Sequence, residues 1–194
     1  MTNLPDEELM LQVRNGTGAM LGILFDRYQV ALFNFYCKST EDRSASEDLV
    51  QDVFYRILKY RHTYRPGTPF RTWMYSIARN ARLDRMKKQA REPGLEVEAQ
   101  AAVEPVDPMQ QRQETALLHR ALMQLPVEKR EVLVLSRFQD LSYQQIAHVL
   151  GCEVGAVKVR IFRALRDLGI ILRQLEQQTM SPRKDSQQIF GAES

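Results

Sequence analysis

The chain has 194 residues, of which 44% are hydrophobic and 26% charged, and its formal net charge is +3. This length allows one large domain or two small ones. A net charge so close to zero excludes a uniformly basic protein, so any affinity for nucleic acid has to come from local clusters of Lys and Arg.

Membrane and export signals are missing from the sequence. No apolar run approaches the roughly 20 residues that span a bilayer, and the N-terminus is acidic where a signal peptide would be basic. Cys37 and Cys152 are distant from each other, and two lone thiols suit a reducing cytosol better than a disulfide scaffold. We therefore expect a cytoplasmic protein with no membrane insertion.

Helical periodicity runs through nearly every segment, and no segment alternates with period two as a strand does, which predicts an all-α fold. The N-terminal half begins with helices predicted over residues 5–15, 18–38 and 46–61. One side of the third helix is apolar, and the other presents Asp48, Gln51, Asp52 and Tyr55. That polar side is either an ordinary solvated surface or a docking surface, with acidic residues around an aromatic ring. The local sequence leaves both interpretations open.

Residues 62–70 hold two prolines and a glycine and therefore predict a loop. The helix that follows has a buried stripe (Phe70, Trp73, Met74, Ile77 and Ala81), and six of the seven charged residues between Arg79 and Arg91 are basic. Arginines beside aromatic rings suit single-stranded nucleic acid, because the rings stack on bases and the cations hold phosphates. We assign stacking first to Tyr64 and Tyr75, since Phe70 and Trp73 fit the core. Asp84, the one acid, falls on the apolar side and should have an ion-pair partner.

Two segments have a different composition. Residues 92–108 contain five acids, three prolines and a glycine but no basic residue, which predicts a flexible acidic linker. Residues 176–194 are polar and without periodicity, which predicts a disordered tail. Between them, helices are predicted from Met109 to Gln124 and again after Pro126.

Residues 141–168 carry the signature of a helix-turn-helix. Ser142 and Gln145 fit a capping box, and Gly151 fits the end of the first helix. The second helix has a stripe expected to be buried (Val154, Val157, Ile161, Ala164, Leu165 and Leu168) and an opposite side without acids. That side holds Ala156, Val159, Arg160, Arg163 and Arg166, flanked by Lys158 and Phe162. The alternative is an ordinary helical hairpin, but exposed faces usually mix charges of both signs.

These segments resemble the bacterial extracytoplasmic-function (ECF) sigma factors over about residues 5–175. Residues 48–60, DLVQDVFYRILKY, resemble the helix of the family's second region that docks on the clamp helices of RNA polymerase. Residues 70–88, FRTWMYSIARNARLDRMKK, resemble the segment that melts the promoter and recognises the −10 element. Residues 125–168 resemble the fourth region, whose recognition helix contacts the −35 element.

The resemblance implies two small helical domains: region 2 in residues 1–91 and a helix-turn-helix region 4 in residues 109–175. It implies core RNA polymerase, promoter DNA (duplex at −35, single-stranded at −10) and an anti-sigma factor as partners, and no cofactor, metal or catalytic residue. The implied polymerase-binding residues are Asp48, Gln51, Asp52, Phe54 and Tyr55. The implied −10 residues are Tyr64, Arg65, Phe70, Arg71, Trp73, Tyr75, Arg79, Asn80 and Arg82, and the implied −35 residues are Ala156, Lys158, Val159, Arg160, Phe162, Arg163 and Arg166.

The sequence departs from the family at two of these positions. Ala156 stands where a hydroxyl residue is usual, and Val159 where a serine is common. Apolar groups at both positions favour contacts with thymine methyls over hydrogen bonds, so the −35 sequence cannot be copied from relatives.

Two other classes of function compete with the sigma factor. A transcriptional regulator explains residues 141–168 equally well but leaves the Asp48 surface and the aromatic–basic segment unexplained. An enzyme is disfavoured because the three histidines are scattered, neither cysteine has zinc-ligand spacing, and no glycine-rich phosphate loop is present.

Overall fold

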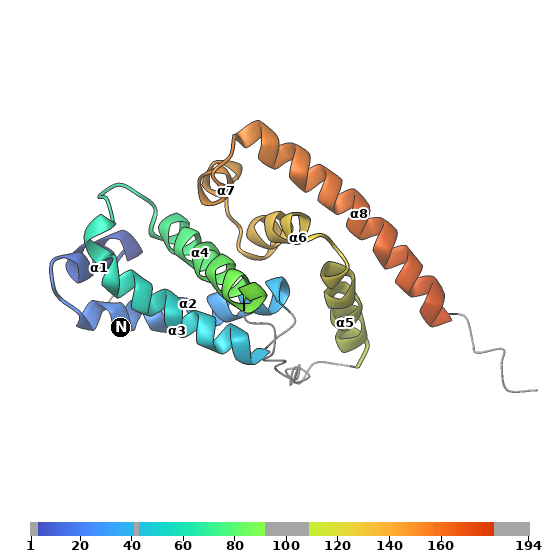
Figure 1. Ribbon diagram of the computed structural model, residues 1–194, viewed down its shortest axis with the longest axis horizontal. Coiled ribbons are helices and arrows are strands. Elements are labelled where there is room, and N and C mark those ends of the chain that lie inside the picture. Colours follow the sequence, from blue (N-terminus) through green and yellow to red (C-terminus); the bar gives the residue numbers. More distant parts are fainter. Residues whose placement is uncertain (1–3, 41–42, 92–108, 181–194) are drawn as a thin grey trace, which may run out of the picture.

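A computed structural model describes residues 4–40, 43–91 and 109–180 (Figure 1). Every regular element in those three ranges is helical, which confirms the predicted all-α fold. The segment predicted to be a linker, residues 92–108, lies outside the described residues, as do residues 181–194. No helix in the described part of the chain is long and apolar enough to cross a membrane.

The N-terminal domain consists of four helices packed around one apolar core. α2 packs on α1 and α3, and α4 lies across α3. The core is formed by side chains such as Leu24, Phe35 and Met74, which have no exposed surface. The elements are α1 (Asp6–Arg14), α2 (Ala19–Ser39), α3 (Arg43–Lys59), a 3₁₀ turn (Arg61–Thr63) and α4 (Phe70–Arg91).

The C-terminal domain contains α5 (Met109–Met123), α6 (Val127–Leu133), a π-helical turn (Val134–Phe138), α7 (Tyr143–Leu150) and α8 (Val154–Met180). The predicted capping box opens α7, because the Gln145 backbone N–H donates to Ser142 Oγ at 3.2 Å and the Ser142 N–H donates to Gln145 Oε1 at 2.8 Å. Gly151 ends α7 with φ of 63°, a left-handed conformation that glycine adopts without strain. The predicted helix-turn-helix is therefore present.

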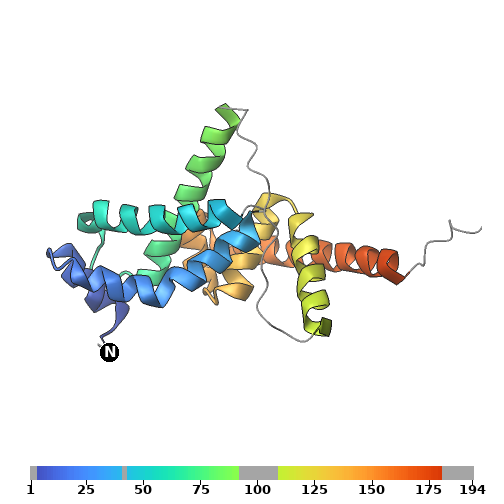
Figure 2. The ribbon, with the colours of Figure 1, turned by 90° about the horizontal axis from the view of Figure 1, so that it is seen from below.

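The prediction that residues after Leu175 lack structure is wrong for residues 176–180, because α8 continues to Met180. The apolar stripe of the recognition helix continues at helical spacing through Leu168, Ile171 and Leu175. Leu175 is buried, and this end of α8 packs on α5. Figure 2 shows the resulting long helix, which extends well past the N-terminal domain.

Removal of the α7 cap tests the stability of the helix-turn-helix. Replacing Ser142 with Ala leaves the Gln145 N–H without its acceptor, so we expect the free energy of unfolding to fall by about 1 kcal/mol. The measurement is urea unfolding followed by circular dichroism. Gln144→Ala is the control, because Gln144 is exposed in the same turn and alanine favours helix. An equal loss in both variants would contradict the role of the cap.

Candidate polymerase- and DNA-binding surfaces

The recognition helix presents one face to solvent and buries the other. Val157, Ile161 and Ala164 are buried against the domain, whereas Phe162 is 70% exposed and Val159 47% exposed. Leu165, predicted to be buried, is instead 39% exposed. The four predicted −35 cations are all exposed: Lys158, Arg160, Arg163 and Arg166.

One acid lies at the edge of this recognition face. Asp167 accepts two hydrogen bonds from Arg166 at 3.1 Å and one from Lys129 of α6. The ammonium group of Lys129 and the guanidinium of Arg166 hold the pKa of the Asp167 carboxyl below its usual range. Arg166 is thus partly neutralised, whereas Arg163 has no ion-pair partner among the described residues. Ala156, also predicted to contact DNA, is half-buried.

Of the five α3 residues predicted to form a docking face for polymerase, three are exposed, one is partly exposed (Asp52) and one is buried (Phe54). Asp48, Gln51 and Tyr55 are exposed, and Tyr55 is 63% exposed. Phe54 was predicted to belong to this face, but it is buried, and its ring packs edge-on against Phe25 with 4.8 Å between centroids. The prediction is wrong for Phe54 because the turn of the helix places this ring toward α2.

The acids of α3 also form ion pairs with neighbouring cations. Arg56 contacts Asp52 at 2.9 Å and Asp84 of α4 at 2.7 Å, and Arg85 of α4 contacts Asp48 at 3.3 Å. The expected partner of Asp84 is therefore Arg56, although the Asp84 side chain is half-exposed and not buried. The pairs with Asp84 and Arg85 join α3 and its docking face to α4, whereas the Arg56–Asp52 pair lies within α3.

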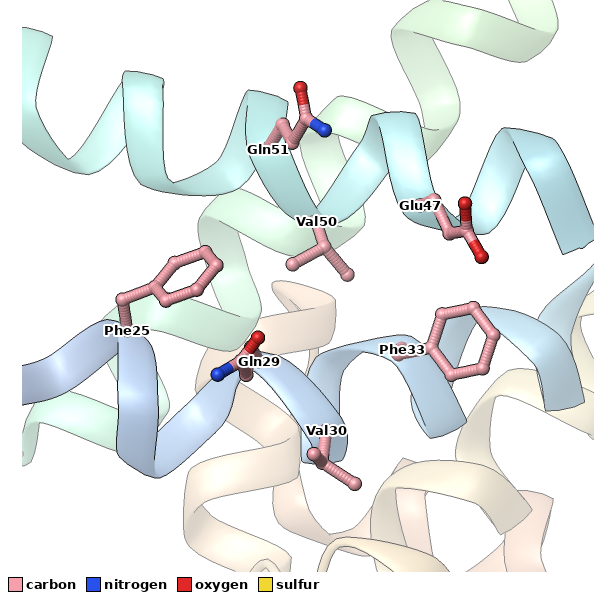
Figure 3. A pocket seen from close by; sticks show the side chains of 7 residues that line it. All are labelled: Phe25, Gln29, Val30, Phe33, Glu47, Val50 and Gln51. Atoms are coloured by element: carbon pink, nitrogen blue, oxygen red, sulfur yellow. The ribbon is translucent and has the colours of Figure 1, made fainter. Parts of the chain in front are cut away.

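A groove that the sequence did not reveal lies beside this face, between α2 and α3 (Figure 3). Phe25, Val30 and Phe33 of α2 line it together with Val50 and Gln51 of α3. Gln51 belongs to both the groove and the docking face. The sequence signal was present in α2, because Val30 and Phe33 are apolar although they lie off its buried stripe.

The aromatic residues near α4 belong to the core. Tyr64 and Tyr75, predicted to stack on bases, have no exposed surface. The Tyr64 hydroxyl donates to the Thr68 carbonyl at 2.5 Å and its ring contacts Trp73, while the Tyr75 hydroxyl donates to Gln139. Burial raises the pKa of each of the two hydroxyls to about 12. In this conformation neither tyrosine can stack on a base, so the prediction is wrong for both.

Other predicted −10 residues are distributed between the core and the surface. Phe70 is fully buried and contacts Trp73, which is half-buried. Arg65 and Asn80 are exposed. Solvent reaches Trp73 and this exposed pair without rearrangement.

The remaining α4 residues of that set contact the C-terminal domain. Glu131 of α6 forms ion pairs with both Arg82 and Arg79, the latter at 3.2 Å. Gln139 accepts hydrogen bonds from Tyr75 through its side chain and from Arg71 through its carbonyl oxygen, at 2.5 Å. Arg82 belongs to the predicted −10 set, yet it is 2% exposed because the C-terminal domain covers it. Sequence reasoning missed Glu131 and Gln139, since neither belongs to a motif.

The described residues thus define a two-domain helical protein with a helix-turn-helix in its second domain. Residues 24–92 match the family model described as Sigma-70 region 2, and residues 115–168 match Sigma-70, region 4. The sigma factor CarQ of Myxococcus xanthus is 31% identical over 173 residues, which cover 86% of this chain and 97% of CarQ. The chain belongs to the ECF family of RNA polymerase sigma factors.

Other relatives agree over most of the chain. The sigma-H factor of Pseudomonas aeruginosa is 29% identical over 188 residues, covering 90% of this chain and 97% of the relative. Among solved structures, CnrH in complex with the cytosolic domain of CnrY has a TM-score of 0.68 at 28% identity, covering 87% of this chain and 97% of CnrH. RpoE of Bartonella quintana, solved with the anti-sigma factor NepR, has the same fold, with a TM-score of 0.66 at 23% identity over 77% of this chain and 96% of RpoE.

Chemical modification tests the burial of the two tyrosines. With N-acetylimidazole, we expect acetylation of the exposed Tyr55 and Tyr143 and protection of Tyr64 and Tyr75, read by peptide mass mapping. In urea all four should react, which controls for intrinsic reactivity. Acetylation of Tyr75 in the native protein at the rate of Tyr55 would show that the α4–Gln139 contact is open in solution.

Proposed function

We propose that this chain binds core RNA polymerase through the exposed face of α3 and the adjoining α2–α3 groove, and directs initiation at promoters that it recognises at −10 and −35. The observation that carries the proposal is the pair of surfaces that one chain presents. An exposed acidic–aromatic face on α3 and an exposed basic face on α8 lie on separate domains. A protein with both can hold polymerase with one domain and duplex DNA with the other.

In this proposal α4 binds the melted strand of the −10 element. Trp73, Arg65 and Asn80 are candidates that are accessible in the described conformation. Gln139 and Glu131 hold Arg71, Arg79 and Arg82, which supply cations for the backbone once the C-terminal domain moves away. Single-strand binders combine cations with aromatic rings in this manner. The chain acts in the cytoplasm as an initiation factor, with no catalysis of its own, and a restraining anti-sigma protein is part of the same proposal. In a solved structure the similar protein CnrH is bound to the cytosolic domain of another protein, CnrY, which supports a protein partner for this fold.

Recognition of the −35 element falls to the exposed face of α8. Arg160 and Arg163 provide contacts to guanine or phosphate, and Phe162 and Val159 provide apolar contacts that suit thymine methyls. Because Val159 is exposed and lacks a hydroxyl, a Val159→Ser variant would exchange a methyl contact for a hydrogen bond.

Reconstituted transcription tests the function. Core polymerase with this chain should initiate at promoters of the source genome, whereas a transcriptional regulator would need another sigma factor to be present. In the same assay Tyr55→Ala should weaken the complex with core polymerase about tenfold, because an exposed tyrosine on such a face is a frequent interface hot spot. The measurement is fluorescence titration of the labelled chain with core.

The matched control for this titration is Tyr60→Ala. Tyr60 is also exposed, at 42%, and follows the end of α3, about 140° around the helix from Tyr55. Its replacement should leave the affinity for core unchanged. Equal weakening by both replacements would place the polymerase contact elsewhere, and failure of the unmodified chain to initiate would remove the proposal.

Binding of −35 duplex DNA by the holoenzyme distinguishes specific recognition by the exposed face of α8 from nonspecific attraction between basic residues and DNA. Arg163→Ala should weaken binding about tenfold and, if Arg163 contacts a phosphate, reduce the slope of log K against log salt by about one. Arg173→Ala is the control, because Arg173 is exposed on the same helix beyond the helix-turn-helix. Equal effects from the two arginines would contradict specific recognition by this face.

A further inference from the structure

The contact between α4 and α6 has the chemistry of a phosphate site. Arg82 and Arg79 converge on the Glu131 carboxylate from successive turns of α4, and this carboxylate is 5% exposed. Arginine recognises carboxylate and phosphate with the same forked arrangement of N–H donors. A carboxylate held by two arginines therefore occupies the place that a phosphodiester could take.

Arg82 retains a donor that Glu131 does not use, and it shares a neighbouring pocket with Arg85. The Nε atoms of Arg82 and Arg85 are buried and have no hydrogen-bond partner among the described residues. Both arginines line a pocket that extends from α4 to Val127 of α6, between the two domains. Buried N–H groups are nearly always paired in proteins, so the unpaired Nε of Arg82 is a donor that an acceptor other than Glu131 could satisfy.

We propose that Arg79 and Arg82 form a binding site for one backbone phosphate of single-stranded DNA, and that Glu131 occupies this site as a phosphate mimic when the domains are packed together. The C-terminal domain and the melted strand then compete for α4. This inference rests on the proposed role of α4 in single-strand binding. It adds the residue that blocks this role in the free chain.

Gln139 reinforces the competition. Its carbonyl oxygen accepts from Arg71 at 2.5 Å and its side chain accepts from Tyr75. Four α4 residues of the predicted −10 set are therefore engaged by only two residues of the C-terminal domain. In contrast, Arg160 and Arg163 of α8 stay exposed in the same conformation. The masking is specific to the single-strand surface.

The test measures binding of the full chain, without polymerase, to a fluorescent single-stranded oligonucleotide of random sequence. Glu131→Gln removes the charge that holds the arginines and should increase affinity about tenfold, because a larger fraction of molecules has a free site. Glu128→Gln is the matched control: Glu128 is an exposed glutamate of the same helix, and its loss changes the net charge equally. We expect its affinity to equal that of the unmodified chain.

Two further arms identify the ligand group. The gain should disappear when the oligonucleotide carries neutral methylphosphonate linkages, and also when Arg79→Ala is added to Glu131→Gln. Equal affinity of the Glu131→Gln and Glu128→Gln variants, or a gain that survives either arm, would overturn the phosphate site. If Glu131→Gln fails to fold by circular dichroism, Glu131→Asp, which keeps the charge but shortens its reach, replaces it with a smaller expected gain.

Failure of the phosphate site can be distinguished from failure of the proposed function. A chain that initiates with core polymerase but shows no effect of Glu131→Gln would keep its function and lose the masking site. A chain that never initiates would lose the proposed function whatever the oligonucleotide result.

Discussion

The ion pair between Arg82 of α4 and Glu131 of α6 is a deeply buried polar contact between the two domains, beside an apolar core to which both contribute. Both side chains are almost completely buried, at 3% and 6% exposure. Burial of an ion costs several kcal/mol, and the attraction between the partners offsets this only where the geometry is good. When the domains separate, water hydrates both groups. The pair by itself therefore contributes little net stability.

Contacts between distant parts of the chain also decided which parts of the fold could be predicted from the sequence. Helix α7 has a capping box at its start and a left-handed glycine at its end, so the sequence was sufficient to predict both of its ends. The stripe of α8 predicted its buried side, but the polar residues after Leu175 hid its last turns, which packing on α5 stabilises. Local signals thus predicted where helices begin, whereas the length of α8 depended on a tertiary neighbour.

The candidate sites also divided into one that local sequence could predict and one that depended on distant residues. The exposed face of α8 was predictable, because one domain alone decides its exposure. The α4 surface was not, since Tyr75 and Arg82 are buried by residues that lie about 50 or more positions further along the chain. Periodicity identifies the side of a helix that faces its own domain, and α4 has a second buried side. Phe54 failed for a different reason: its spacing from Val50 and Ile57 places it on the apolar side of α3, and only the family resemblance assigned it to the docking face.

The unequal exposure of the two DNA-binding surfaces orders the steps of promoter recognition. In the described conformation α8 can meet duplex DNA immediately, because Arg160 and Arg163 are already exposed. The α4 arginines that Glu131 and Gln139 hold can bind DNA phosphates only after these two residues withdraw. Under the proposed masking, duplex recognition can therefore precede full capture of the melted strand. The α3 face lies outside the masked contact, so polymerase can bind this face before the domains separate.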